Sequence, residues 1–150
     1  MSVTPTTVDG HPHVGIQVGT EPVQKLPVDV KVNLDPAIGG PSAGLMFSLG
    51  IYDTLTPGSL TGGKTIAGTG TVDAAGSVGP IGGIQQKIVG ARDAGAQLFL
   101  VPPDNCAEAL GAPNGDMRLV KATTMHDALR AVQTWVQDPS ASLPSCEGAS

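Results

Sequence analysis

The chain has 150 residues, enough for one compact domain with a substantial core. With 40% hydrophobic, 14% charged and 3% aromatic residues, it is neither a disordered nor a highly charged chain, and its core must be aliphatic. The net charge of −5, with eight dispersed Lys and Arg residues, argues against nucleic-acid binding, and no apolar run is long enough to cross a membrane.

The first third of the chain is expected to contain a lead-in, two strands and a helix. Residues 1–12 show no hydrophobic periodicity and are expected to form a flexible lead-in. Residues 13–18 and 28–34 alternate apolar and polar side chains, the period of half-buried strands. After a Gly-Gly-Pro break at 39–41, the stretch 42–53 is apolar nearly all round, which favours a central, buried helix.

The rest of the chain mixes short strands and helices without strict βαβ alternation, so we expect an α+β fold with mixed sheets packed against helices. One domain is predicted over 13–137, followed by a tail rich in Ser and Pro at 138–150. The predicted elements are a strand interrupted by glycines (65–73), a hairpin turn (74–76), a return strand (77–81), a helix (84–94), a buried strand (98–101), a short helix (104–110), a strand (117–121) and an amphipathic helix (124–137).

The segment around Ser42 is the first candidate for chemistry. It reads Gly-Gly-Pro-Ser-Ala-Gly over 39–44, so small residues leave the hydroxyl sterically open where a helix begins. The first N–H groups of a helix and the positive end of its dipole would offer donors to an oxyanion there. The alternative is a plain helix N-cap, a position that Ser favours, and this segment by itself fits the cap more simply.

Lys87 is the second candidate. Three apolar residues form a stripe along the predicted helix: Ile84, Ile88 and Ala91. Lys87 lies on the same stripe and is expected to face the core, where a lysine must pair with a carboxylate or lose its charge. A neutral lysine beside an exposed serine activates the hydroxyl without a histidine. The alternative is a lysine whose stem covers the stripe while its ammonium group reaches water.

Residues 58–65, Gly-Ser-Leu-Thr-Gly-Gly-Lys-Thr, match the Walker A pattern of nucleotide-binding loops. Such a loop follows a buried strand and opens a helix. This stretch instead follows a predicted helix and precedes a predicted strand. We therefore expect a glycine-rich turn here and not a nucleotide site.

The two cysteines, Cys106 and Cys146, are too far apart for a redox CxxC pair or a zinc knuckle. One interpretation is two unrelated thiols. The other is a disulfide that ties the tail to the body, because a buried free thiol has no reason to lie in a polar tail. A disulfide would place the domain in an oxidising compartment.

Four segments together resemble, in order and spacing, the proteolytic domain of Lon peptidases. The resemblance extends over about residues 28–137 and implies the Lon-type fold. The segments that carry it are Gly-Pro-Ser-Ala-Gly at 40–44, Thr-Gly at 69–70, Pro-Ile-Gly-Gly at 80–83, and Lys87.

The resemblance implies a Ser-Lys dyad, with Ser42 as nucleophile and Lys87 as general base. Thr69 matches the family threonine whose hydroxyl orients the lysine, and the backbone around Gly40 and Pro41 would line the oxyanion site. The substrates implied are proteins or peptides. No metal or organic cofactor takes part in the hydrolysis.

Departures from the family pattern point away from its ATP-driven members. Gly39 stands where an acidic residue often precedes Gly-Pro-Ser, Thr71 replaces the glutamate of Thr-Gly-Glu, and no ATPase module accompanies the domain. The stretch 51–58 is closer to bacterial Lon-like proteases with an upstream PDZ domain and a membrane anchor. That resemblance implies an ATP-independent endopeptidase on the extracytoplasmic side of a membrane, cutting unfolded or exposed segments, and a homo-oligomer such as the family's hexameric ring. The alternative is a catalytically silent scaffold of the same fold.

Overall fold

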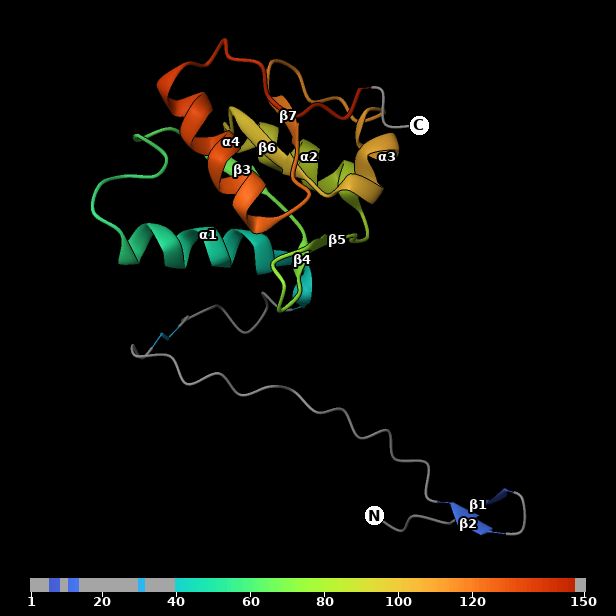
Figure 1. The fold of residues 1–150 in the computed structure, drawn as a ribbon. Helices are drawn as coiled ribbons and strands as arrows, with labels where there is room; N and C mark the ends of the chain where they lie inside the picture. The colour runs from blue at the N-terminus through green and yellow to red at the C-terminus, as the bar shows by residue number, and fades with distance from the viewer. Residues whose placement is uncertain (1–5, 9–10, 14–29, 32–39, 148–150) are drawn as a thin grey trace. The chain divides into compact units, whose positions relative to one another are not determined.

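The computed structural model describes residues 6–8, 11–13, 30–31 and 40–147 (Figure 1). The chain divides into two units, Met1–Val32 and Asn33–Ser150, which are described separately. In the first unit, strands β1 (Thr6–Val8) and β2 (His11–His13) pair antiparallel. The sequence carried no periodic signal for this pair.

The two strands predicted at 13–18 and 28–34 lie almost entirely outside the described residues. His13 belongs to β2, and Val30 and Lys31 belong to no strand.

The second unit is built on a parallel sheet of three strands in the order β3-β6-β7. These are β3 (Ile66–Gly68), β6 (Leu98–Val101) and β7 (Arg118–Lys121). A second, antiparallel sheet pairs β4 (Thr71–Val72) with β5 (Val78–Gly79) across the turn predicted at 74–76. The mixture of small sheets and helices is consistent with the expected α+β class, although the larger sheet is parallel.

Four α-helices and two short 3-10 helices surround these sheets in the described part of the chain. In chain order they are η1 (Pro41–Ala43), α1 (Gly44–Leu55), α2 (Ile84–Asp93), η2 (Pro103–Asn105), α3 (Cys106–Ala109) and α4 (Met125–Gln137). None of them is long and apolar enough to cross a membrane.

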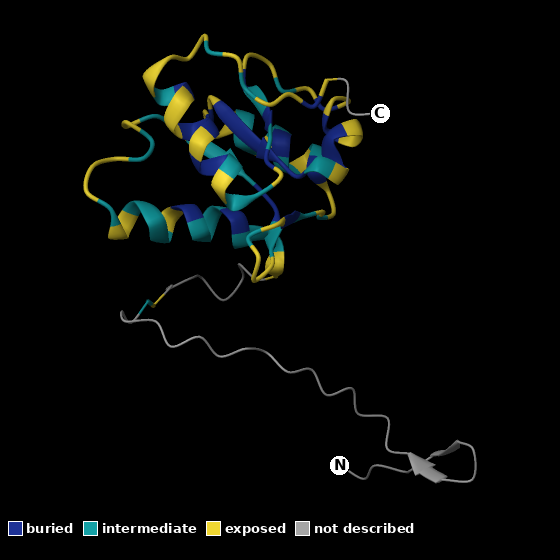
Figure 2. Ribbon diagram, in the orientation of Figure 1, coloured by how far each residue is buried: buried dark blue, intermediate teal, exposed yellow. Residues whose placement is uncertain are grey.

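Strand β6 separates two apolar cores because its side chains alternate between the faces of the sheet. Leu98 and Leu100 belong to a core shared with α1 and α4. Phe99 and Val101 belong to a second core shared with α2 and α3. All four residues of β6 are buried, which places the strand in the middle of this unit (Figure 2).

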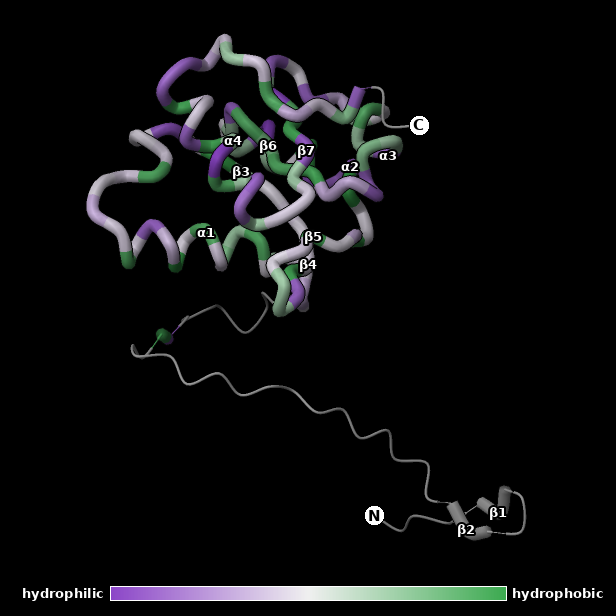
Figure 3. Tube along the Cα trace, viewed as in Figure 1, coloured by the Kyte–Doolittle hydropathy of each residue, from purple (hydrophilic) through white to green (hydrophobic). Residues whose placement is uncertain are grey.

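Helix α1 forms where the sequence predicted a helix, but the expectation that it is buried all round is wrong for the described residues. Leu45 and Leu49 are its buried residues, and Leu55 is 56% exposed. Apolar residues occur along its whole length (Figure 3), so the apolar pattern did not reveal which face would be covered. Only the face toward α4 and the sheet is buried among the described residues.

The tail is fixed along β7 by main-chain and side-chain contacts. The Lys121 N–H donates to the Pro144 carbonyl at 2.9 Å, and the Arg118 guanidinium donates to the carbonyls of Pro139 (2.8 Å) and Ala141 (2.6 Å). The expected tail beyond residue 138 is therefore an ordered strap as far as residue 147.

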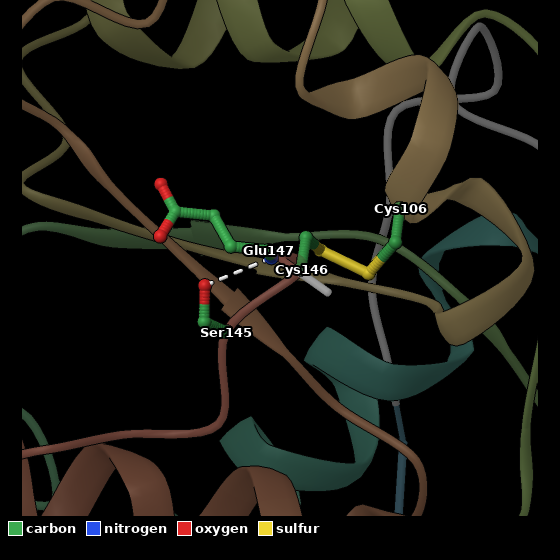
Figure 4. The surroundings of a disulfide bond; sticks show 4 residues. All are labelled: Cys106, Ser145, Cys146 and Glu147. Carbon is green, nitrogen blue, oxygen red and sulfur yellow. Dashed lines mark hydrogen bonds between the residues drawn. A yellow bond between two sulfur atoms is a disulfide. The ribbon is translucent and has the colours of Figure 1, made fainter. Parts of the chain in front are cut away.

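A disulfide joins the end of this strap to the body of the unit. Cys146 is bonded to Cys106 at the start of α3, and both residues are 1% exposed (Figure 4). They lie in the core that also contains Ile84 and Ile88 of α2. The disulfide therefore attaches the end of the strap to α3, in the core that α2 also lines.

Replacing both cysteines by serine should lower the free energy of unfolding by about 2–4 kcal/mol, because the disulfide closes a loop with a sequence separation of 40 in the unfolded chain. Urea unfolding of Cys106→Ser/Cys146→Ser against the parent protein measures the difference. Ser145→Ala, also in the strap, is the control and should change stability little. Equal stability of the double variant and its parent would show that the disulfide does not constrain the chain.

Helix α4 begins after Thr124, whose side chain caps its first turn. The Thr124 hydroxyl accepts a hydrogen bond from the Asp127 N–H at 3.0 Å. Arg130 donates to the Asp127 carboxylate at 2.7 Å. The Arg130 hydrogen bond, followed by one with the Thr124 hydroxyl, holds the pKa of Asp127 below its ordinary value.

Because the pKa of Asp127 is lowered in the folded state, its carboxylate stabilises the protein above the unfolded pKa, and this contribution is lost as the pH falls through the folded pKa. Asp127→Asn should therefore lower stability at pH 7 by about 0.5 kcal/mol, as expected for a solvated ion pair near a helix N-terminus. The difference should shrink toward acid pH. Thermal melts of both proteins across that range test this, and a constant difference would contradict it.

Candidate active site

Ser42 lies inside the first turn at the start of α1. It is the middle residue of η1, whose N-cap is Gly40, with φ 98° and no side-chain cap hydrogen bond. The N-cap of α1 is Ala43. The Ser42 hydroxyl makes no hydrogen bond with any described residue, so the interpretation of Ser42 as a plain helix N-cap is wrong.

The small residues around Ser42 allow close approach of neighbouring segments. A Cβ on Gly44 would lie 3.2 Å from the Val72 nitrogen and 3.4 Å from the Gly70 oxygen. The Leu45 N–H donates to the same Gly70 oxygen at 3.0 Å. Gly44 thus allows the start of α1 to pack against the chain that leaves β3.

Thr69, directly after β3, connects this start of α1 to α2. Its side chain is 3% exposed, and its hydroxyl donates to the Ser42 carbonyl at 2.9 Å. The Gly70 N–H donates to the same carbonyl at 2.8 Å. The Thr69 hydroxyl also accepts a hydrogen bond from Lys87 Nζ at 3.3 Å. A threonine hydroxyl has one donor and two acceptor sites, so both interactions are compatible.

Lys87 approaches Thr69 from α2. Ile84 and Ile88 of the same stripe are fully buried, whereas Lys87 and Ala91 are half-buried. Among the described residues no carboxylate lies within ion-pairing distance of Lys87, and its side chain hydrogen-bonds to Thr69. The lysine therefore points to the buried Thr69, and it is half-buried where the stripe predicted a lysine facing the core.

The structure brings three of the predicted residues into one connected arrangement, Lys87 Nζ to Thr69 Oγ1 to the Ser42 carbonyl. Gly40 and Pro41 lead directly into it and are exposed. No hydrogen bond joins Ser42 Oγ to Lys87 Nζ in the described part of the chain.

Metal-binding side chains do not gather in the described residues, where no three or more His, Cys, Asp or Glu side chains converge. His126 is exposed at the start of α4.

Sequence reasoning missed Asn105, a polar side chain that is only 6% exposed. Its carboxamide accepts from the Ile81 N–H at 2.9 Å and donates to the Ile81 carbonyl at 3.0 Å. Ile81 lies in the Pro-Ile-Gly-Gly loop before α2. The sequence offered no signal for this pairing, because Asn105 falls in the predicted short helix over 104–110 and its partner is a main-chain segment.

The Walker A-like stretch forms a turn at 60–63 that leads into β3 and not into a helix. Lys64 lies 4.5 Å from the centre of the Trp135 ring and donates to the Val136 carbonyl at 3.4 Å. Its charge therefore supports the end of α4, where a cation is favourable.

Titration of the protein with Mg-ATP should give no binding heat, because the glycine turn does not open a helix. Lys64→Ala should instead lower the free energy of unfolding by about 0.5–1 kcal/mol, through loss of the contact with Trp135. Lys121→Ala serves as the comparison lysine for the stability measurement. Saturable ATP binding that Lys64→Ala removes would overturn this interpretation.

The family described as Lon protease (S16) C-terminal proteolytic domain matches residues 21–134. Lon protease 2 of Herpetosiphon aurantiacus is 36% identical over 81 residues, covering 54% of this chain and 10% of that protein. Lon protease of Campylobacter concisus is 33% identical over 95 residues, which cover 61% of this chain and 12% of that protein. Lon protease 2 of Bacillus subtilis is 30% identical over 103 residues, which cover 67% of this chain and 18% of that protein. The chain thus spans less than a fifth of these relatives.

Proposed function

The chain belongs to the family of Lon protease C-terminal proteolytic domains, and we propose that it is a serine endopeptidase in which Ser42 is the nucleophile and Lys87 the general base. The observation that carries the proposal is the connected arrangement of Lys87, Thr69 and the Ser42 main chain. It joins the Lys87 amine to the main chain of Ser42. The Ser42 hydroxyl itself has no hydrogen-bond partner among the described residues.

The proposed reaction needs only the chain's own residues and water. The Lys87 amine takes the proton of the Ser42 hydroxyl as Oγ bonds to the peptide carbonyl carbon. The lysine then gives this proton to the leaving amine as the peptide C–N bond breaks, which leaves an acyl-enzyme. Water, deprotonated by Lys87, attacks the ester and releases Ser42 with its proton restored. The amine acts as base and then as acid in each half of the cycle.

In this scheme Thr69 orients the Lys87 amine. Its hydroxyl hydrogen is committed to the Ser42 carbonyl, so its oxygen is left to accept from Lys87 Nζ. An amine that donates in this direction has its lone pair directed away from Thr69 and available to another donor. The Ser42 hydroxyl is the donor proposed, and the hydrogen bond between them would form as substrate binds.

The oxyanion is proposed to form against the backbone between Gly40 and Ser42. The N–H groups at the first turn of a helix have no intrahelical acceptor, and the positive end of the dipole lies there. Such preorganised donors stabilise the charge that develops on the carbonyl oxygen. The positive φ of Gly40 gives the backbone the bend with which it enters this turn.

We further propose that the enzyme is independent of ATP and acts outside the cytoplasm on unfolded or exposed protein segments. The disulfide between Cys106 and Cys146 supports an oxidising compartment. Gly39 and Thr71, where ATP-driven relatives differ, support independence from ATP. An upstream PDZ domain, a membrane anchor and a ring of subunits belong to the same proposal for the full-length protein.

A catalytically silent scaffold is the competing function. It would have no need for a hydrogen-bonded lysine facing the segment of an unpartnered serine hydroxyl. The endopeptidase is therefore the function that this geometry favours.

Ser42→Ala and Lys87→Ala should each reduce cleavage of fluorescein-labelled unfolded casein by about 10⁴-fold or more, because loss of either member of a nucleophile–base pair removes most of the catalysis. Fluorescence release measures the rate, and thermal melting should remain close to that of the parent protein.

Two matched variants control for the loss of a serine or a lysine. Ser48→Ala removes a hydroxyl on the next turn of α1, which donates to the Gly44 carbonyl, and Lys121→Ala removes a lysine from β7. Both should cleave casein at near the parental rate. Cleavage that survives Ser42→Ala or Lys87→Ala would refute the dyad, and a folded parent protein without activity would favour the scaffold.

A further inference from the structure

Thr69 and Asn105 are the two buried polar side chains of the described residues. A buried polar group is costly unless its hydrogen bonds are satisfied, so each requires an explanation. Thr69 contacts Lys87 directly. Asn105 contacts neither member of the dyad, yet it lies at the base of the helix that carries Lys87.

The carboxamide of Asn105 holds both main-chain groups of Ile81, at 2.9 Å to the N–H and 3.0 Å to the carbonyl. This two-point pairing fixes the position and the orientation of one peptide segment. Ile81 stands between β5 and α2, just before Gly82 and Gly83. A loop with two successive glycines has little conformational preference of its own, so its path depends on such an external anchor.

Helix α2 begins without a capping side chain. Its N-cap is Gly83, in the left-handed conformation at φ 69°, and no side-chain hydrogen bond caps the helix. The Lys87 N–H donates to the Gly83 carbonyl at 3.2 Å, so the lysine belongs to the first closed turn. The point at which this turn forms therefore depends on where the preceding loop is held.

Residues that follow Asn105 in the chain also contact α2. Gln85 donates to the Glu108 carbonyl at 3.2 Å, and Ile84 and Ile88 pack in one core with Cys106, which follows Asn105 and carries the disulfide. These contacts hold the side of the helix, whereas the Asn105 carboxamide binds the main chain before its first turn.

We propose that Asn105 is a positioning residue for Lys87: by binding both main-chain groups of Ile81, it sets where α2 begins and holds Lys87 Nζ against Thr69. The inference rests on the proposed function of Lys87 as base. The Lys87–Thr69 distance of 3.3 Å is at the long end for a hydrogen bond, so a small displacement of α2 breaks it. A misplacement of about 1 Å in a catalytic group can lower a rate roughly 100-fold.

The test compares Asn105→Ala with Asn114→Ala. Asn114 is a half-buried asparagine of the same unit that donates to the Met117 carbonyl at 2.7 Å, so its loss also removes a loop hydrogen bond. The rate of Ser42 acylation by a fluorophosphonate probe reports activation of the hydroxyl without a chosen substrate. Asn105→Ala should label roughly 10- to 100-fold more slowly, and Asn114→Ala at the parental rate. A parental rate in Asn105→Ala would overturn the inference.

A double-mutant cycle with Thr69→Val separates positioning from general loss of stability. If Asn105 acts through the Lys87–Thr69 contact, Asn105→Ala should slow labelling little further in the Thr69→Val protein. Fully multiplicative effects would contradict the inference. Asn105→Ser, which is too short to reach both groups of Ile81, replaces Asn105→Ala if the latter does not fold.

Amide hydrogen exchange, measured by NMR, tests independently of catalysis whether Asn105 sets the start of α2. In Asn105→Ala the Lys87 amide should lose protection relative to Asn114→Ala, because the first turn of α2 is no longer held; equal protection would overturn the inference. Probe labelling that persists in Ser42→Ala and Lys87→Ala would refute the dyad instead, and the exchange result would still show whether Asn105 sets the start of α2.

Discussion

A buried hydroxyl has to satisfy its hydrogen bonds within the protein, and Thr69 does so with two segments that are distant in the sequence. It donates to the main chain of Ser42 and accepts from the side chain of Lys87. The serine segment, the end of β3 and helix α2 are therefore linked through one oxygen atom. The order of these bonds matters, because a threonine that donates to a carbonyl can only accept from the lysine.

The sheet and its flanking glycines make this meeting possible. Strand β6 buries its side chains on both faces, so α1 and α2 are held in separate cores on opposite sides of the sheet. Thr69 links the two sides where the chain leaves β3, and there Gly68 and Gly70 leave room. A Cβ on Gly68 would lie 2.8 Å from Leu100 Cβ, and one on Gly70 would lie 2.6 Å from a methyl group of Val78. Larger residues at these positions would displace β6 and β5, which pack around Thr69.

Local periodicity accounts for what could be predicted from the sequence. The buried run of β6, the stripe of α2 and the amphipathic pattern of α4 each determined an element and its facing side within a few residues. The inward direction of Lys87 followed from the same stripe. The family, which the chain's match over 21–134 establishes, rested on several short motifs together.

Contacts between distant segments account for what could not be predicted. The apolar pattern of α1 did not distinguish its covered face from its open face, since both are apolar. Whether Ser42 was a helix cap depended on a 3-10 turn that starts at Pro41, and sequence preference alone favoured the cap. Asn105 and Ile81 are 24 positions apart, and the Asn105 carboxamide binds the main chain of Ile81, so the identity of residue 81 gives no sign of the pairing. Composition indicated a tail rich in Ser and Pro, but it could not show the contacts of that tail with Arg118 and Lys121.

The strap along β7 has a consequence for how the domain behaves beside other chains. β7 is one of the two edge strands of the sheet, and an edge strand presents unpaired N–H and C=O groups on which a foreign strand can add. The Pro144 carbonyl occupies the Lys121 N–H, and the prolines of the strap have no N–H of their own to offer an incoming strand. The covalent link at Cys146 keeps this cover in place during local opening. The strap thus covers part of the β7 edge, the kind of cover by which proteins limit the addition of a foreign strand.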